Sequence, residues 1–157
     1  AFVVAMIWGY GKVGYGPTRV RWVLTGNETS RARDLPVDAT VSDRLLTGSM
    51  KVRKDGPVEA FRFMNNEGKI RNLGSSFFTK WLYFVSAQAG PDDANAAPIL
   101  DQRVVGWLTE HAGVGLALNS TDAYSQYLDL ISGWGAAYNR TPVQVEKAIF
   151  GLATGRD

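Results

Sequence analysis

The sequence predicts an all-α protein, and three observations support this fold class. Apolar residues recur at helical spacing in several segments, prolines and glycines stand where those helices would begin and end, and no segment has the clear pattern of a strand. The 157 residues, of which 45% are hydrophobic and 20% are charged, have the length and composition of one globular domain. We therefore expect residues 1–157 to form a single multi-helix domain of about six or seven helices.

The first half of the chain alternates helical patterns with breaks. An apolar run at residues 2–8 ends in the glycine-rich stretch GYGKVGYGP, and Pro17 then suits the first turn of a helix that Gly26 closes. A polar loop at residues 27–40 precedes a short helix, and the next helix has apolar residues at helical spacing after Pro57. The predicted helices after the apolar run span residues 17–26, 41–49 and 55–68.

The second half begins with the most aromatic helix of the chain. After the tight connection KIRNLGSS, the stretch SSFFTKWLYFV continues to about Gln88, before the loop AGPDDANAAP. Asp101 then has the features of a helix N-cap, because Leu100 before it and Val105 four residues into the helix have the spacing of a hydrophobic staple. The helices that follow are expected over residues 101–113, 120–139 and 141–152.

The composition excludes several kinds of chemistry. The chain has no cysteine, so it has no disulfide, no thiolate nucleophile and no cysteine-held zinc or iron–sulfur cluster. Its single histidine, His111, argues against a histidine-based metal site and suits an ordinary capping or surface position. We expect no metal and no cofactor, so any chemistry must use carboxylates, hydroxyls or amines. No apolar run approaches the roughly 20 residues that span a bilayer, and no membrane partner is expected.

Charge is unevenly distributed along the chain. Residues 1–80 carry thirteen lysines and arginines against seven aspartates and glutamates, whereas residues 81–157 carry four against eight. A basic half of this kind is expected where one face of a protein meets a polyanion, although surface charge varies widely. The chain also begins inside an apolar run, AFVVAMIWGYG, without an initiator methionine, and we expect residues upstream of Ala1 to be missing.

Lys80 stands in the middle of the stretch SSFFTKWLYFV. On a helix it has Ser76 and Phe77 one turn before it and Tyr83 and Phe84 one turn after it, so most of its neighbours are aromatic. Burial and the positive end of the helix dipole both disfavour an ammonium ion there, and a neutral amine is a nucleophile. The alternative is that the side chain extends along these neighbours to water, as lysines near a helix start often do.

The segment NLGSSFFTK, which ends in Lys80, and the segment PILD, which ends in Asp101, together resemble a known family. They are similar to the helix-hairpin-helix DNA glycosylases, in particular to a bacterial group of 8-oxoguanine DNA glycosylases. In that family a hairpin leads into Thr-Lys, and an aspartate follows at a similar distance at the start of another helix. The strongest resemblance spans residues 56–111. The hairpin departs from the family pattern LPGVG, because residues 73–78 read LGSSFF and keep one glycine.

The resemblance implies an enzyme that excises a modified base from DNA. Lys80 would be the amine nucleophile that attacks C1′, and Asp101 would accept its proton and stabilise positive charge on the sugar. The resulting Schiff base would permit β-elimination, which is AP-lyase activity. The substrate would be 8-oxoguanine or another modified base, such as a hypermodified phage cytosine in an antiviral role. The alternative is that Asp101 is only a helix cap, worth about 1 kcal/mol.

The hairpin before the aromatic helix is the expected DNA contact. A helix start offers unpaired backbone N–H groups that suit a DNA phosphate, and nearby basic side chains add nonspecific attraction. The alternative is an ordinary turn between two helices. The expected DNA-binding residues are Lys69, Arg71, Gly74, Ser75, Ser76 and Phe77.

A base that leaves the DNA stack needs a pocket, and aromatic side chains suit its walls. In the resembled family this pocket forms between the N-terminal part and the last helices. Trp8 with the adjoining glycine-rich loop, Tyr124 and Trp134 are therefore the candidate pocket residues, although aromatic residues more often form core.

Two other classes of protein stay open. A noncatalytic helix-hairpin-helix DNA-binding module would keep the hairpin and the basic half but would not need Lys80 to face Asp101. A helical bundle for protein interaction would need neither feature. The glycosylase hypothesis predicts double-stranded DNA containing a modified base as the partner, action as a monomer, and a bacterial cytoplasmic location at the nucleoid when acting.

Overall fold

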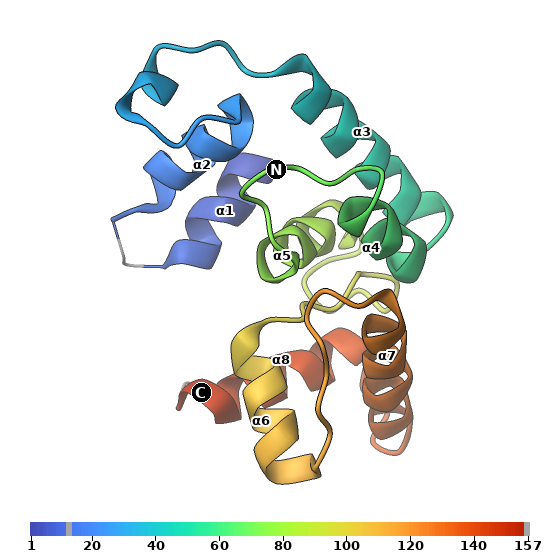
Figure 1. The fold of residues 1–157 in the computed structure, drawn as a ribbon. Coiled ribbons are helices and arrows are strands. Elements are labelled where there is room, and N and C mark those ends of the chain that lie inside the picture. Colours follow the sequence, from blue (N-terminus) through green and yellow to red (C-terminus); the bar gives the residue numbers. More distant parts are fainter. Residues whose placement is uncertain (12–13, 156–157) are drawn as a thin grey trace.

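The computed structural model describes residues 1–11 and 14–155, and this part of the chain consists of helices and loops without a strand (Figure 1). It confirms the all-α class and contains eight α-helices, one more than the upper number expected, and one 3-10 helix. No helix in these ranges combines the length and apolar character needed to cross a membrane. The helices are α1 (Phe2–Tyr10), α2 (Gly16–Thr25), η1 (Ser30–Arg33), α3 (Ala39–Lys54), α4 (Pro57–Asn65), α5 (Ser75–Ser86), α6 (Gln102–Ala112), α7 (Thr121–Ala136) and α8 (Pro142–Thr154).

The largest difference from the expected helices is the length of α3. The sequence pattern predicts a helix over residues 41–49, whereas α3 is 16 residues long and continues to Lys54. Gly48 lies within this helix, where its lack of a side chain permits close packing. A Cβ atom there would lie 2.8 Å from Met64 Sδ and 3.0 Å from Trp81 Cη2. The position therefore needs a glycine for contact with α4 and α5 rather than for helix termination.

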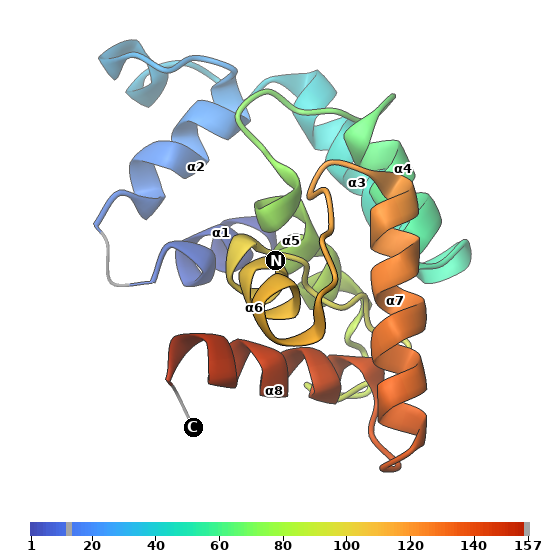
Figure 2. The ribbon, with the colours of Figure 1, turned by 60° about the horizontal axis from the view of Figure 1, so that its bottom comes forward.

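Helices α4 and α5 lie between two groups of helices. α1, α2 and α3 form an arc on one side, and α6, α7 and α8 form the group on the other (Figure 1). α5 packs against α1, α3 and α4, and α4 also packs against α7. Figure 2 shows α8 running across the end of the second group, where it contacts α6 and α7. This arrangement places the aromatic helix α5 at the centre of the fold.

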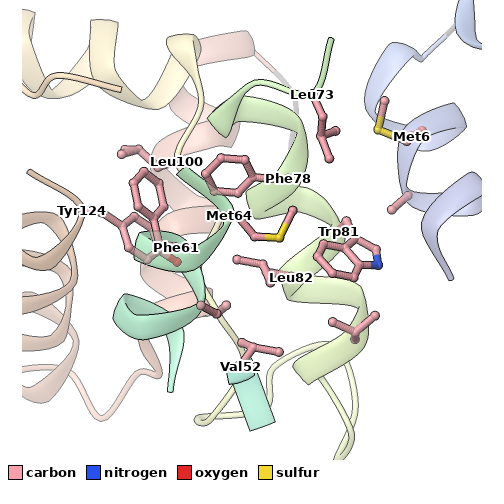
Figure 3. Close-up of a cluster of buried hydrophobic side chains, with 14 of the residues drawn as sticks. Met6, Val52, Phe61, Met64, Leu73, Phe78, Trp81, Leu82, Leu100 and Tyr124 are labelled. Atoms are coloured by element: carbon pink, nitrogen blue, oxygen red, sulfur yellow. The ribbon is translucent and has the colours of Figure 1, made fainter. Parts of the chain in front are cut away.

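Aromatic side chains join the central helices α4 and α5 to α7 through the core (Figure 3). Phe61 of α4 stacks on Tyr124 of α7 with ring centroids 4.4 Å apart, and it meets the edge of Phe78 of α5 at 5.0 Å. Leu82 of α5 and Leu100, which precedes α6, are fully buried in the same cluster. Aromatic pairs of these geometries stabilise beyond the area that they bury. The core thus holds α5 in place against the residue that precedes Asp101.

The loop of residues 66–74 connects α4 to α5. Asn72 adopts the left-handed conformation with φ of 65°, and the extended Gly74 is the N-cap of α5. Within the described residues, the first amides of α5 that find a backbone partner are those of Phe77 and Phe78, and both bond to the Gly74 carbonyl. No cap side chain serves the start of this helix, so α5 begins with unpaired N–H donors beside an exposed glycine.

Candidate active site

Lys80 and Asp101 form a buried ion pair. Lys80 Nζ lies 2.8 Å from Asp101 Oδ2, and the two residues are 7% and 8% exposed. Lys80 also donates to the backbone carbonyl of Ser76 at 2.9 Å and lies 5.6 Å from the ring centroid of Phe77. The side chain is therefore directed at Asp101 rather than at solvent, and the structure brings together the two residues that the sequence singles out.

Asp101 uses its two carboxylate oxygens for two different tasks. Oδ1 accepts hydrogen bonds from the backbone N–H groups of Arg103 and Val104, at 3.0 and 3.2 Å, and so caps α6. Oδ2 accepts the hydrogen bond from Lys80. Because the cap holds one oxygen at the helix start, the other is aimed at α5. The residue is thus a helix cap and an ion-pair partner at once.

Helix α1 lies against the stem of Lys80 at Gly9. A Cβ atom at this position would lie 2.9 Å from Lys80 Cδ and 3.2 Å from Phe77 Cε1, so any side chain would force the lysine to move. The glycine therefore lets α1 cover the aliphatic part of Lys80. Residues 12 and 13 of the glycine-rich stretch lie outside the described residues.

A cavity of about 320 Å³ opens beside the ion pair. Helices α1, α5 and α8 and the segment before α6 supply its walls, which are apolar for the most part. In the described part of the chain, no group of histidine and carboxylate side chains is placed to hold a metal ion. The lining residues are Trp8, Lys80, Tyr83, Ile99, Asp101, Glu146, Lys147, Phe150 and Gly151.

Glu146 is a buried carboxyl in this cavity that sequence reasoning missed. It is 4% exposed, and burial raises its pKa to about 8, helped by the nearby Asp101 charge and opposed by the Lys80 and Lys147 charges. The carboxyl is therefore mostly neutral at pH 7. A signal was present in the sequence, because Glu146 stands three residues from each of the buried Val143 and Ile149, on the apolar face of α8.

The raised pKa of Glu146 predicts a specific dependence of stability on pH. Between the ordinary pKa of 4.5 and the folded value of about 8, the native state keeps a proton that the unfolded state has released. The free energy of unfolding therefore falls as pH rises through this window and levels off above it. Glu146→Gln has no group that titrates here, so its free energy of unfolding does not fall in this window. Relative to the wild type, we expect the free energy of unfolding of the variant to be higher at pH 9, by about 3 to 5 kcal/mol more than the difference seen at pH 4.5.

Urea unfolding at both pH values measures this difference between the two proteins. Glu110→Gln is the matched control, because Glu110 is exposed on α6. An equal change with pH in the wild type and in Glu146→Gln would contradict the prediction.

The structure brings only one of the three candidate pocket residues to the cavity. Trp8 lines it, is 53% exposed, and meets the edge of Phe84 at a centroid distance of 5.6 Å. Tyr124 lies in the core, where its hydroxyl donates to the carbonyl of Pro98 at 2.8 Å. Trp134 lines a different surface hollow near the end of α7. Ile99, Glu146 and Phe150 instead complete the cavity wall.

The candidate DNA-binding residues lie together at the loop before α5. Lys69, Arg71 and Gly74 are exposed, and Ser76 and Phe77 are half-buried. Arg71 lies 3.4 Å from Glu28, and both side chains stay largely in solvent, so this ion pair is weak. The Ser75 hydroxyl donates to Asn119 Oδ1 at 3.0 Å and is therefore engaged within the protein.

The fold and the cavity define a class of protein: an all-helical chain that holds an amine and a carboxylate in contact inside a mostly apolar pocket. Such a pair can attack an electrophilic carbon and remove the proton that the attack displaces. The chain belongs to the family described as "Putative 8-oxoguanine DNA glycosylase OGG-like protein", whose model matches residues 1–150. This match confirms the resemblance that the Thr-Lys and aspartate segments indicate. Comparisons with curated proteins and with solved structures found no match.

Proposed function

We propose that the protein is a DNA glycosylase that excises a modified base from double-stranded DNA, with Lys80 as nucleophile and Asp101 as the catalytic carboxylate. The observation that carries this proposal is the 2.8 Å contact between Lys80 Nζ and Asp101 Oδ2 at the wall of a cavity. Family membership supports the same activity. A structural ion pair alone has no need of an adjoining cavity with an aromatic ring at its edge.

The proposed reaction begins with the breaking of the N-glycosidic bond. Its electron pair leaves with the base, which takes up a proton from water, while the Asp101 carboxylate stabilises the positive charge that develops on the sugar. Lys80 then passes one ammonium proton to Asp101 Oδ2, which the resting ion pair already holds within hydrogen-bond distance, and the neutral amine forms a bond from Nζ to C1′. Ring opening gives a Schiff base, from which β-elimination would cleave the strand on the 3′ side.

The cavity suits a single base that has rotated out of the helix stack. Its volume of about 320 Å³ is close to the lower end of the range for small-molecule pockets, which is about 300 to 1,000 Å³. We therefore favour 8-oxoguanine or another modified base of ordinary size over a hypermodified cytosine that carries a bulky group. The half-exposed Trp8 offers a ring against which the base can stack.

The loop between α4 and α5 supplies the proposed helix-hairpin-helix contact with a DNA phosphate. The unpaired N–H groups at the start of α5 and the dipole of this helix favour an anion next to Gly74. Lys69 and Arg71 stand in the same loop and add positive charge. The Lys80 side chain follows in the second turn of α5, so a phosphate at the helix start would bring the DNA backbone close to the nucleophile.

Removal of the two basic side chains tests this contact. We expect Lys69→Ser/Arg71→Ser to weaken duplex binding about equally for modified and unmodified DNA and to reduce the slope of log K against log salt by about 1 to 2. Fluorescence anisotropy across a salt series measures both quantities. Lys54→Ser, at the exposed C-terminal end of α3, is the control for a general loss of positive charge. An unchanged salt slope in the double variant would place the DNA elsewhere.

The proposed activity is tested directly by release of a base from duplex DNA. Duplexes that each carry one modified base, 8-oxoguanine opposite cytosine among them, are incubated with excess protein, and the released base is detected by mass spectrometry. Release from at least one duplex supports the glycosylase. Tight DNA binding without release or covalent trapping would favour a noncatalytic DNA-binding module instead.

A further inference from the structure

Glu146 is a buried carboxyl without a partner in the protein. It lies on the inward face of α8 with 4% exposure, and within residues 1–11 and 14–155 its side chain has no ion pair and no hydrogen bond. Its carboxyl oxygens are not among the fully enclosed side-chain atoms that lack a partner in these ranges, so they are open to space beside the protein rather than closed off in the core. The carboxyl lines the same cavity as Lys80 and Asp101. A ligand in this cavity would supply the partner that the protein does not.

The groups around Glu146 decide its charge. Lys80 and Tyr83 face the cavity from α5, Asp101 from the segment before α6, and Lys147 from α8 itself. From α7, Tyr127 contributes a buried hydroxyl that is already committed to the carbonyl of Ile99 at 3.0 Å. Lys80 is paired with Asp101, and Lys147 with Asp92 at 2.8 Å. Both lysines thus have carboxylate partners of their own, and burial keeps Glu146 protonated, with a pKa of about 8.

We infer that Glu146 is the residue that reads the base: its carboxyl group, in the neutral form, donates one hydrogen bond and accepts another at an edge of the flipped base. This inference rests on the proposed glycosylase function and names the group that confers specificity on it. The substrate class is a base whose exposed edge carries an acceptor next to a donor. An oxidised purine with an N–H group next to a carbonyl on its five-membered ring meets this requirement, whereas unmodified guanine presents two acceptors, N7 and O6, along its major-groove edge.

The protonation state makes this recognition dependent on pH. A neutral carboxyl offers a donor and an acceptor side by side, but an ionised carboxylate only accepts. As pH rises through about 8, Glu146 loses the donor, and the base loses one of its two hydrogen bonds. Trapping at an abasic site involves no base and uses Lys80 and Asp101 but no contact with a base edge, so the ratio of base excision to abasic-site trapping isolates the contribution of Glu146.

The experiment compares two variants with the wild type. Glu146→Gln keeps a donor and an acceptor at similar length, and Glu146→Met keeps the length without either. Single-turnover excision of 8-oxoguanine from a duplex and borohydride trapping on an abasic-site duplex are measured from pH 6 to pH 9.5. For Glu146→Met we expect excision to fall about tenfold to a hundredfold, with trapping within about twofold of the wild type. For the wild type the ratio should fall above pH 8, and for Glu146→Gln it should not.

The outcomes distinguish failure of the inference about Glu146 from failure of the proposed glycosylase function. Equal excision by Glu146→Met and the wild type overturns the inference and leaves the glycosylase standing. A parallel loss of excision and trapping also overturns it, because Glu146 would then act on Lys80 or on folding rather than on the base. If the ratio of excision to trapping falls above pH 8 in Glu146→Gln as well, another group titrates, and the inference is again overturned. No excision and no trapping by the wild type would instead overturn the proposed function, and the inference with it.

Discussion

Lys80→Ala should form no covalent complex with DNA on borohydride reduction and should lose base release by at least about a thousandfold. The reason is that Lys80 supplies the only amine in contact with Asp101 among the described residues, and loss of a nucleophile removes the covalent step itself. The measurement is trapping on a gel together with single-turnover release of the base. Lys54→Ala is the matched control, because it removes an exposed lysine from the end of α3 and leaves the cavity intact.

Loss of activity in Lys80→Ala has to be separated from loss of folding. Removal of one partner from a buried ion pair costs about 3 to 5 kcal/mol, because it leaves the other charge without compensation. Lys80→Gln keeps a hydrogen-bond donor near Asp101, and we expect it to be more stable than Lys80→Ala and equally inactive. Thermal unfolding and DNA binding are measured on both variants. Trapping that persists in a folded Lys80 variant would assign the nucleophile to another residue.

Asp101→Asn should lower base release about a hundredfold to a thousandfold while the protein still binds DNA. This substitution distinguishes the two tasks of Asp101, because asparagine caps a helix about as well as aspartate does. The cap hydrogen bonds to Arg103 and Val104 are therefore kept, and only the negative charge opposite Lys80 is lost. Single-turnover base release and duplex binding measure the two effects.

A second aspartate cap provides the control for Asp101→Asn. Asp38 caps α3 by accepting from the N–H of Thr40 at 2.8 Å, and it is exposed. Asp38→Asn should leave base release unchanged. If Asp101→Asn releases base at the wild-type rate, Asp101 is a cap alone and the proposed role of its charge is wrong. Asp101→Ala removes the cap as well as the charge, so we expect its free energy of unfolding to be about 1 kcal/mol lower than that of Asp101→Asn. This difference measures the contribution of the cap to stability.

Local sequence rules singled out the two members of the ion pair, and the family resemblance predicted that they meet. Asp101 caps a helix because its side chain can reach the first amides, and the apolar Leu100 and Val105 fix the entry of the chain into α6. Lys80 stands early in a helix whose neighbours are aromatic, so its environment could be inferred from helical spacing. Together with the family resemblance, these two local arguments were enough to expect that the residues meet.

Other features depended on packing between distant helices and could not be read from local patterns. The length of α3 depends on whether Gly48 ends a helix or contacts Met64 and Trp81, and the sequence does not distinguish these cases. Aromatic residues at helical spacing suit a pocket and a core equally well, and Tyr124 lies in the core because α7 packs on α4 there. The spacing of Glu146 from Val143 and Ile149 places it on the apolar face of α8, but that this face lines a cavity beside Lys80 and Asp101 follows only from how the helices pack.

The shared use of Asp101 links the proposed catalytic geometry to fraying of the first turn of α6. Because the amides of Arg103 and Val104 hold one oxygen, the other reaches Lys80 already oriented and would need little reorganisation when charge develops in the proposed reaction. Opening of the first turn of α6 would release this orientation without any change in the cavity walls. The hydrogen-exchange protection of these two amides therefore reports how often the carboxylate is out of position, from the backbone alone and in the absence of DNA.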